Sequence, residues 1–190
     1  MASMTQNLKQ RLPEILLEIF SVVLAVLVAL GVNQWQEDKE NAELAELART
    51  KIEAEVRSNI DEVEGAGTKI QGLLAELRGT IKEVETGAEG EIGLSFPVAV
   101  LSSSAWDTSK ATQALNYMDF EWVMRVGRVY DLQKIHHQSQ TEVLNFISSM
   151  DHSEASQPAR MLRGFLGRAE TALELQQGLL EDYRDLLTNP

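Results

Sequence analysis

The sequence predicts an all-α protein, with a single N-terminal transmembrane helix followed by an antiparallel helical bundle of about four helices. Three observations lead to this prediction. A long apolar segment occupies residues 15–32, apolar residues elsewhere recur at three- to five-residue intervals, and no segment sustains the alternation that is typical of strands. With 190 residues, the chain is long enough for one domain and a short additional element.

The apolar segment from Ile15 to Val32 contains 18 residues, of which only Glu18 is charged. About 20 apolar residues cross the hydrocarbon core of a bilayer. Trp35 follows at the position of an interfacial aromatic anchor. We therefore predict a transmembrane helix over residues 14–35, preceded by a short cytoplasmic N-terminus over residues 1–13.

Two other interpretations of this segment are open. A buried helix of a soluble protein is disfavoured by the 14 uncharged apolar or small residues from Ile19 to Val32. A cleaved signal peptide is a closer alternative, because two basic residues precede the segment and Ala29-Leu30-Gly31 has the form of a cleavage site. Glu14 and Glu18 intrude on the apolar segment and favour an uncleaved anchor.

Charge is divided unevenly along the chain. Residues 1–36 carry two basic and two acidic side chains, so residues 37–190 hold the whole net charge of −12. Two basic residues lie before the span and one, Lys39, lies shortly after it, which places the N-terminus in the cytoplasm. Residues 36–190 are then an extracytoplasmic acidic bundle. The acidic balance excludes a nucleic-acid binder, which needs a basic surface.

The segment after the span is amphipathic. Apolar residues recur from Leu44 to Val63 between charged ones, as in a helix with one buried face. We expect Gly65-Ala66-Gly67 to end this helix, and Thr68 to cap a second helix whose apolar face reaches Val84. A Gly-rich loop is expected over residues 87–97.

Capping residues mark the remaining helices. A serine among residues 102–104 is expected to cap a helix that reaches Asn116, and Asp119 to cap the next one. Residues 151–157 are expected to form a polar loop, after which Pro158 suits the first position of the last helix. That helix carries a near-heptad apolar stripe, which indicates packing along its whole length.

One face of the predicted span carries small and polar residues. At steps of three or four residues it presents Glu14, Glu18, Ser21, Ala25, Ala29 and Asn33. Small residues at this spacing let two membrane helices approach closely, and an intramembrane carboxylate is unfavourable unless it faces protein or water. We expect this face to pack against another membrane helix, from a second copy or from a different subunit.

An aromatic group spans the junction between two predicted helices and comprises Trp106, Tyr117, Phe120 and Trp122. Such rings can fill the core of a bundle. They can also form a partner-binding patch, because Trp and Tyr dominate the hot spots of interfaces. The sequence alone leaves both interpretations open.

No motif indicates catalysis, a metal site or a cofactor. Without Cys, the chain has no disulfide, thiolate ligand or Cys nucleophile. His136 and His137 are adjacent, so on a helix they point about 100° apart and do not readily share a metal ion. The acidic residues before and within the Gly-rich loop lack the spacing of a calcium-binding loop. We expect a protein that is not an enzyme, with no catalytic, cofactor-binding or metal residues.

A family resemblance rests on a Glu, several small residues and an Asn-Gln-Trp motif at Glu18, Ala25, Ala29-Leu30 and Val32-Asn33-Gln34-Trp35. These residues and the charged helix after them resemble the start of DUF6090, a bacterial family of single-pass membrane proteins of unknown function. The resemblance covers about Leu16 to Val56 and, more weakly, Trp106 to Tyr130. That family usually has Gly where this chain has Ala25. The resemblance implies a bacterial inner-membrane protein with a periplasmic helical region, and it supplies no catalytic residue.

Two functions from different classes fit these features. The first is a non-enzymatic accessory or structural subunit of a larger membrane protein complex, docked through its transmembrane helix and bracing an extracytoplasmic surface with its bundle. Energy-converting respiratory or photosynthetic complexes are hosts of this kind. The second is a membrane-anchored ligand-binding or sensory helical domain. The short segment before the span leaves little room for a cytoplasmic output domain, so we favour the first.

Overall fold

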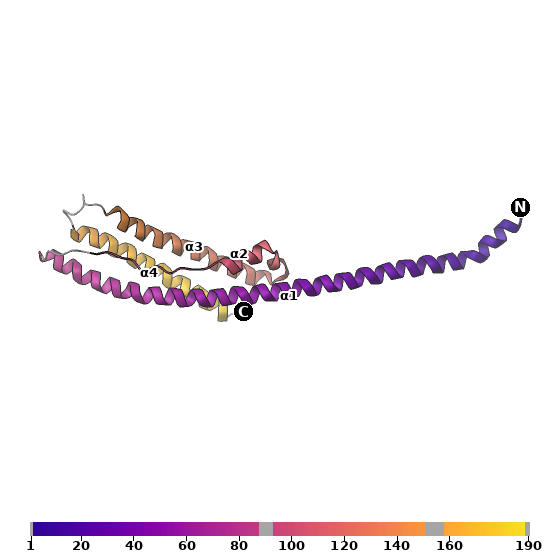
Figure 1. The fold of residues 1–190 in the computed structure, drawn as a ribbon, viewed down its shortest axis with the longest axis horizontal. Coiled ribbons are helices and arrows are strands. Elements are labelled where there is room, and N and C mark those ends of the chain that lie inside the picture. Colours follow the sequence, from indigo (N-terminus) through magenta and orange to yellow (C-terminus); the bar gives the residue numbers. More distant parts are fainter. Residues whose placement is uncertain (1, 88–92, 151–157, 189–190) are drawn as a thin grey trace. The chain divides into compact units, whose positions relative to one another are not determined.

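The computed structural model describes residues 2–87, 93–150 and 158–188, with side chains from Leu16 onward. Its elements are α1 (Ala2–Glu85), α2 (Ser104–Ala111), a short 3₁₀ helix η1 (Ala114–Tyr117), α3 (Phe120–Ser149) and α4 (Pro158–Thr188) (Figure 1). No residue in the described ranges belongs to a strand, so the predicted all-α class is confirmed. The predicted loop over 151–157 and residues 88–92 of the earlier loop lie outside these ranges.

The chain divides into two compact units, Met1–Glu46 and Leu47–Pro190. The first unit belongs to α1, and an 18-residue window of this helix has a mean hydropathy of 2.4. None of that window is buried inside the protein, whereas a core helix of a soluble protein would be mostly covered. By length and composition this segment is a candidate membrane span near the N-terminus, a position that a signal sequence shares.

Three long helices build the second unit: the C-terminal part of α1, α3 and α4. Asp119 caps α3 as predicted, because its Oδ1 accepts a hydrogen bond of 2.8 Å from the backbone N–H of Trp122. Pro158 is the first residue of α4, also as predicted. The heptad stripe of α4 is confirmed, since its buried residues alternate at steps of three and four: Leu162, Phe165, Ala169, Ala172, Gln176, Leu179, Tyr183 and Leu186.

The predicted helix break at Gly65-Ala66-Gly67 is wrong, because α1 continues through it to Glu85. Of these residues, Ala66 and Gly67 are buried and serve packing instead, whereas Gly65 is exposed. A Cβ atom on Gly67 would lie only 2.8 Å from Nε2 of Gln176 on α4. The Gln176 amide occupies that space and donates a hydrogen bond to the backbone carbonyl of Val63. Contact between two helices therefore outweighs the low helix propensity of glycine.

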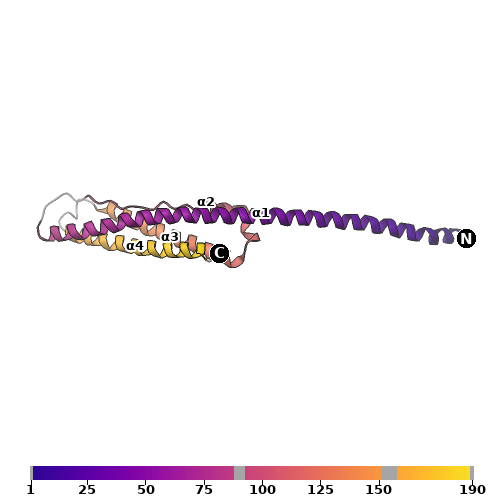
Figure 2. The same ribbon diagram turned by 90° about the horizontal axis from the view of Figure 1, so that it is seen from below.

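The predicted antiparallel arrangement of about four long helices is not confirmed. Residues 52–66 of α1 share a core cluster with Trp122 and Tyr130 near the start of α3, and residues 70–81 share another with Val143 further along α3. Helices α1 and α3 therefore run in the same direction. The chain returns between them through residues 93–103, a non-helical segment that runs back along α1 in both views (Figures 1 and 2). A fourth long helix is thus replaced by an extended segment and the eight-residue α2.

Polar side chains separate the two core clusters. Between them lie Gln133, His136 and Gln140 on α3 and Gln176 on α4, all buried. The Gln140 amide nitrogen lies 3.0 Å from Nδ1 of His136. A buried polar layer of this kind is favourable only when its groups find partners, so it helps to fix the register of the helices.

Helices α1 and α4 are antiparallel, and their facing surfaces carry ion pairs in a regular order. Arg184 pairs with Glu64 at 2.6 Å, Arg78 pairs with Glu170 at 2.6 Å, and Arg163 pairs with Glu85. Each step of 14 or 7 residues along α1 is matched by an equal step back along α4. The charge signs alternate along each helix, so a one-heptad slip would bring charges opposite uncharged residues or like charges.

Candidate functional site

The predicted packing face of the span is open in the structure. Glu18, Ser21, Ala25, Ala29 and Asn33 are all exposed, while the side chain of Glu14 lies outside the described residues. The Ser21 hydroxyl donates a hydrogen bond of 2.8 Å to the backbone carbonyl of Glu18, which satisfies it within the helix. The predicted interface anchor Trp35 is also exposed, at 68%. Nothing in the chain's own described residues covers this face.

The structure divides the aromatic group in two. Trp106 and Trp122 lie in the core with exposures of 9% and 2%, whereas Tyr117 and Phe120 are exposed at 49% and 74%. The first two rings therefore stabilise the bundle. Tyr117 and Phe120 are the members that stay available as a partner patch.

Amide side chains hold the extended segment that ends at α2. Asn59 on α1 donates to the carbonyl of Ser102 and accepts from its N–H, both at 2.9 Å. Gln140 on α3 makes the same double contact with Ala99, accepting at 2.8 Å and donating at 3.3 Å. Because no neighbouring strand is available, these side chains satisfy backbone groups that a sheet would otherwise pair.

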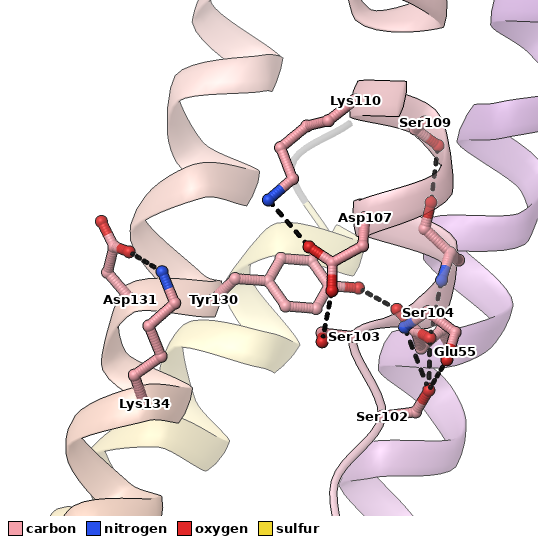
Figure 3. Close-up of polar contacts among 11 residues, drawn as sticks. Glu55, Ser102, Ser103, Ser104, Asp107, Ser109, Lys110, Tyr130, Asp131 and Lys134 are labelled. Carbon is pink, nitrogen blue, oxygen red and sulfur yellow. Dashed lines mark hydrogen bonds and ion pairs between the residues drawn. The ribbon is translucent and has the colours of Figure 1, made fainter. Parts of the chain in front are cut away.

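Glu55 joins three elements at the end of that segment. One carboxylate oxygen accepts from the Tyr130 hydroxyl at 2.6 Å, and the other accepts from the Ser102 hydroxyl at 2.6 Å and the Ala105 N–H at 2.9 Å (Figure 3). Burial and the hydrogen bond to Glu55 raise the pKa of Tyr130 far above its usual value. The phenol therefore stays protonated and acts as a donor.

A cavity of about 320 Å³ lies beside this network, between α2, α3 and residues 99–103. The indole of Trp106 and the ring of Tyr130 line it, stacked nearly parallel at 5° with centroids 5.4 Å apart. Trp106 also lies against Gly127 of α3, where an added Cβ would make ordinary van der Waals contact with the indole at 3.7 Å.

Charged side chains at this cavity come from α2 and α3. Lys110 pairs with Asp107 at 2.8 Å, and Lys134 pairs with Asp131 at 2.9 Å (Figure 3). The hydrogen bond from Lys110 and then that from Ser103 lower the pKa of Asp107, and the hydrogen bond to Asp131 raises the pKa of Lys134. Both shifts favour the charged forms of Asp107 and Lys134. Of these side chains, Asp107, Lys110 and Lys134 line the cavity.

The adjacent residues His136 and His137 differ in burial. His136 is 1% exposed, and burial lowers its pKa, which favours the neutral ring at pH 7. His137 is exposed and lines the cavity. Within the described residues, no cluster of three or more His, Asp or Glu side chains has the arrangement of a metal site.

The cavity was not predicted from the sequence. Its lining joins Ala99, Trp106, Lys110, Tyr130 and Lys134, which stand on three elements and share no spacing motif. Of the lining residues, the sequence drew attention to Trp106 as part of an aromatic group, to His137 as a histidine without a metal site and to Ser103 as a possible cap, but to none of them as part of a shared site. The cavity forms because Asn59 and Gln140 hold residues 99–102 against α1 and α3. A single sequence does not reveal this contact between distant segments.

Comparisons with known proteins add no relative. No family model matches the chain, and neither a curated protein nor a solved structure matches it. The resemblance to DUF6090 therefore stays a prediction, and the function is inferred from the chain's own residues.

Proposed function

We propose that this protein is a non-enzymatic accessory or structural subunit of a larger membrane protein complex. Its N-terminal helix would dock among the membrane helices of the host, and its acidic bundle would brace an extracytoplasmic surface. The proposed host is an energy-converting complex of a bacterial membrane, such as a respiratory or photosynthetic complex.

The observation that carries this proposal is the uncovered apolar part of α1. An 18-residue window with a mean hydropathy of 2.4 has no cover from the protein itself. Such a surface is stable only against lipid or against other helices. A helix that only anchors the protein in lipid needs no particular packing face. The case for a partner helix therefore depends on the face that carries Ser21, Ala25 and Ala29.

That face supports a helix partner in two ways. Its small side chains permit close backbone approach, and Glu18 on the same side is better satisfied beside protein than in lipid. The bundle supports a bracing role, because three long helices with two core clusters and cross-helix ion pairs make a rigid body. Tyr117 and Phe120 offer exposed rings for contact with a host subunit.

Substitutions in the span test the docking. We expect Ala25→Leu together with Ala29→Leu to weaken association with other membrane subunits, because Leu side chains block close approach. The matched control is Val23→Phe with Leu27→Phe, which adds comparable apolar bulk on the opposite side of the same helix. The readout is the set of subunits that copurify in mild detergent. Equal copurification by both double variants would contradict the proposed packing face.

The proposed orientation has a test of its own, because the chain contains no native Cys. A single Cys at Ser58→Cys, an exposed position of the bundle, should react with a membrane-impermeant maleimide on intact cells. Ser3→Cys should react only after the inner membrane is permeabilised. The reverse labelling pattern would place the bundle in the cytoplasm.

A second candidate function is a membrane-anchored ligand-binding domain. The cavity beside Trp106 and Tyr130 favours it, because about 320 Å³ is at the lower end of the range for small-molecule sites. The two functions are compatible, since a bracing subunit can also hold a small ligand.

A further inference from the structure

We propose that the cavity between α2, α3 and residues 99–103 binds a small organic carboxylate with an apolar body. This inference deepens the second candidate function and does not depend on the host complex. It rests on three features of the cavity, namely its size, the chemistry of its walls and the charge at its rim.

The size and walls determine the body of the ligand. About 320 Å³ accommodates a single ring or a short branched chain. Ala99, Leu101, Trp106 and Tyr130 supply apolar surface, and the two rings are held rigidly by their stacking. An apolar body gains by leaving water for such a surface.

The amide groups at this cavity are already engaged. Gln133 donates to the Ser102 carbonyl at 3.1 Å and accepts from the Tyr183 hydroxyl at 2.7 Å. Gln140 is occupied by the backbone of Ala99. A ligand that needs hydrogen bonds would therefore find its donors among the charged side chains.

The rim charge determines the head group. Lys110 and Lys134 line the cavity from α2 and α3, and among the described residues of its lining Asp107 is the single carboxylate (Figure 3). The lining itself carries two lysines and one carboxylate, while Asp131, the partner of Lys134, lies outside the lining. In a chain with a net charge of −12, this balance favours an anion over a cation.

Lys110 and Lys134 also have N–H donors that their aspartate partners do not use. Each ammonium carries three N–H donors, and one hydrogen bond to an aspartate leaves further donors on each. The ammonium of Lys110 lies 5.5 Å from the centroid of the Trp106 ring, which puts charge and apolar wall side by side. A carboxylate held by the two lysines would lay its body on that wall.

The experiment titrates the full chain in mild-detergent micelles with three probes, followed by ligand-observed NMR and corrected for blank micelles. Benzoate carries both the charge and the body, benzamide the body alone, and acetate the charge alone. We expect benzoate to bind, and to bind at least about fivefold more tightly than either of the others. Lys110→Gln and Lys134→Gln should each weaken benzoate binding by about fivefold, the upper end for an exposed charge pair. Lys69→Gln, an exposed substitution away from the cavity, should leave binding unchanged.

Two results would overturn the carboxylate assignment: equal binding of benzamide, or equal binding by both cavity-lysine variants and Lys69→Gln. Because both cavity lysines are exposed on the surface, circular dichroism should show the same helix content in all variants. A third result would also overturn the assignment: binding of benzylamine, a fourth probe with the same body and a positive charge, without binding of benzoate, which would still leave a ligand-binding domain. Binding of none of these probes would overturn both, without bearing on the accessory-subunit proposal.

Discussion

The side-chain amide of Asn59 makes its two shortest hydrogen bonds, both of 2.9 Å, with the backbone of one residue, Ser102, which lies 43 positions later in the chain. Its amide nitrogen also lies 3.4 Å from Oε1 of Gln133 and from the Tyr183 hydroxyl. Asn59 is 2% exposed, so its amide nitrogen and oxygen have no ready access to water if the hydrogen bonds to Ser102 are lost. This contact anchors the extended segment to α1, and with it the start of α2 and one wall of the cavity.

We expect Asn59→Ala to lower the free energy of unfolding by about 1–3 kcal/mol, because it removes two hydrogen bonds to the partly buried backbone groups of Ser102, each worth about 0.5–1.5 kcal/mol. The neighbouring exposed substitution Ser58→Ala should change it by less than about 0.5 kcal/mol. Denaturant unfolding of the full chain, followed by circular dichroism, measures both. An equally small effect of the two substitutions would mean that the segment is held by other contacts.

Substitution by alanine at two glycines of α1 is expected to change the stability of the protein in opposite directions. Gly65 has open space where a Cβ would lie, so Gly65→Ala should raise the free energy of unfolding by up to about 1 kcal/mol through helix propensity. Gly67→Ala should lower it by about 1 kcal/mol, because the methyl group displaces the buried amide of Gln176. The same unfolding measurement compares them. Stabilisation by both substitutions would show that Gln176 moves aside freely.

The buried His136 predicts a loss of stability on acidification. Its pKa is lowered in the folded protein by burial, so below about 6.5, its ordinary value, the unfolded chain binds a proton that the folded protein does not. Stability should therefore fall as the pH drops below about 6.5 and continue to fall toward the lowered pKa. Thermal unfolding between pH 7.5 and 5 measures this, and His136→Gln should remove most of the slope. His137→Gln is the control, and an unchanged slope in His136→Gln would contradict the assignment.

Charge reversal tests the register of α1 and α4. Arg78→Glu should destabilise the protein by about 0.5–1 kcal/mol, because it faces Glu170. Adding Glu170→Arg restores an opposite-charge pair and should recover most of the loss. The double-mutant cycle yields the coupling energy at low salt, and a value near zero would mean that the pair does not help to set the register.

Much of the helical structure was predictable from the chain. The stripe of α4, the cap at Asp119 and the start at Pro158 are local signals, and each is present in the structure. The apolar segment of α1 was equally plain, because its composition differs from everything after it.

The remaining features depend on contacts between distant residues. Gly67 reads as a helix break until the position of Gln176 is known, since the same residue type ends helices and admits close neighbours. Trp106 and Phe120 look alike in sequence, yet one is buried and the other exposed. The parallel course of α1 and α3 follows from the extended segment, whose hold on Asn59 and Gln140 is not a local pattern.

The central claim is that α1 docks this protein in a membrane complex, and the mass of the native assembly tests it most directly. Native membranes would be solubilised in mild detergent, and the particle that contains this chain sized by light scattering, with its subunits identified by mass spectrometry. We predict a particle with additional membrane subunits or further copies of the chain. A homogeneous single chain of 21.2 kDa within its micelle would contradict the account.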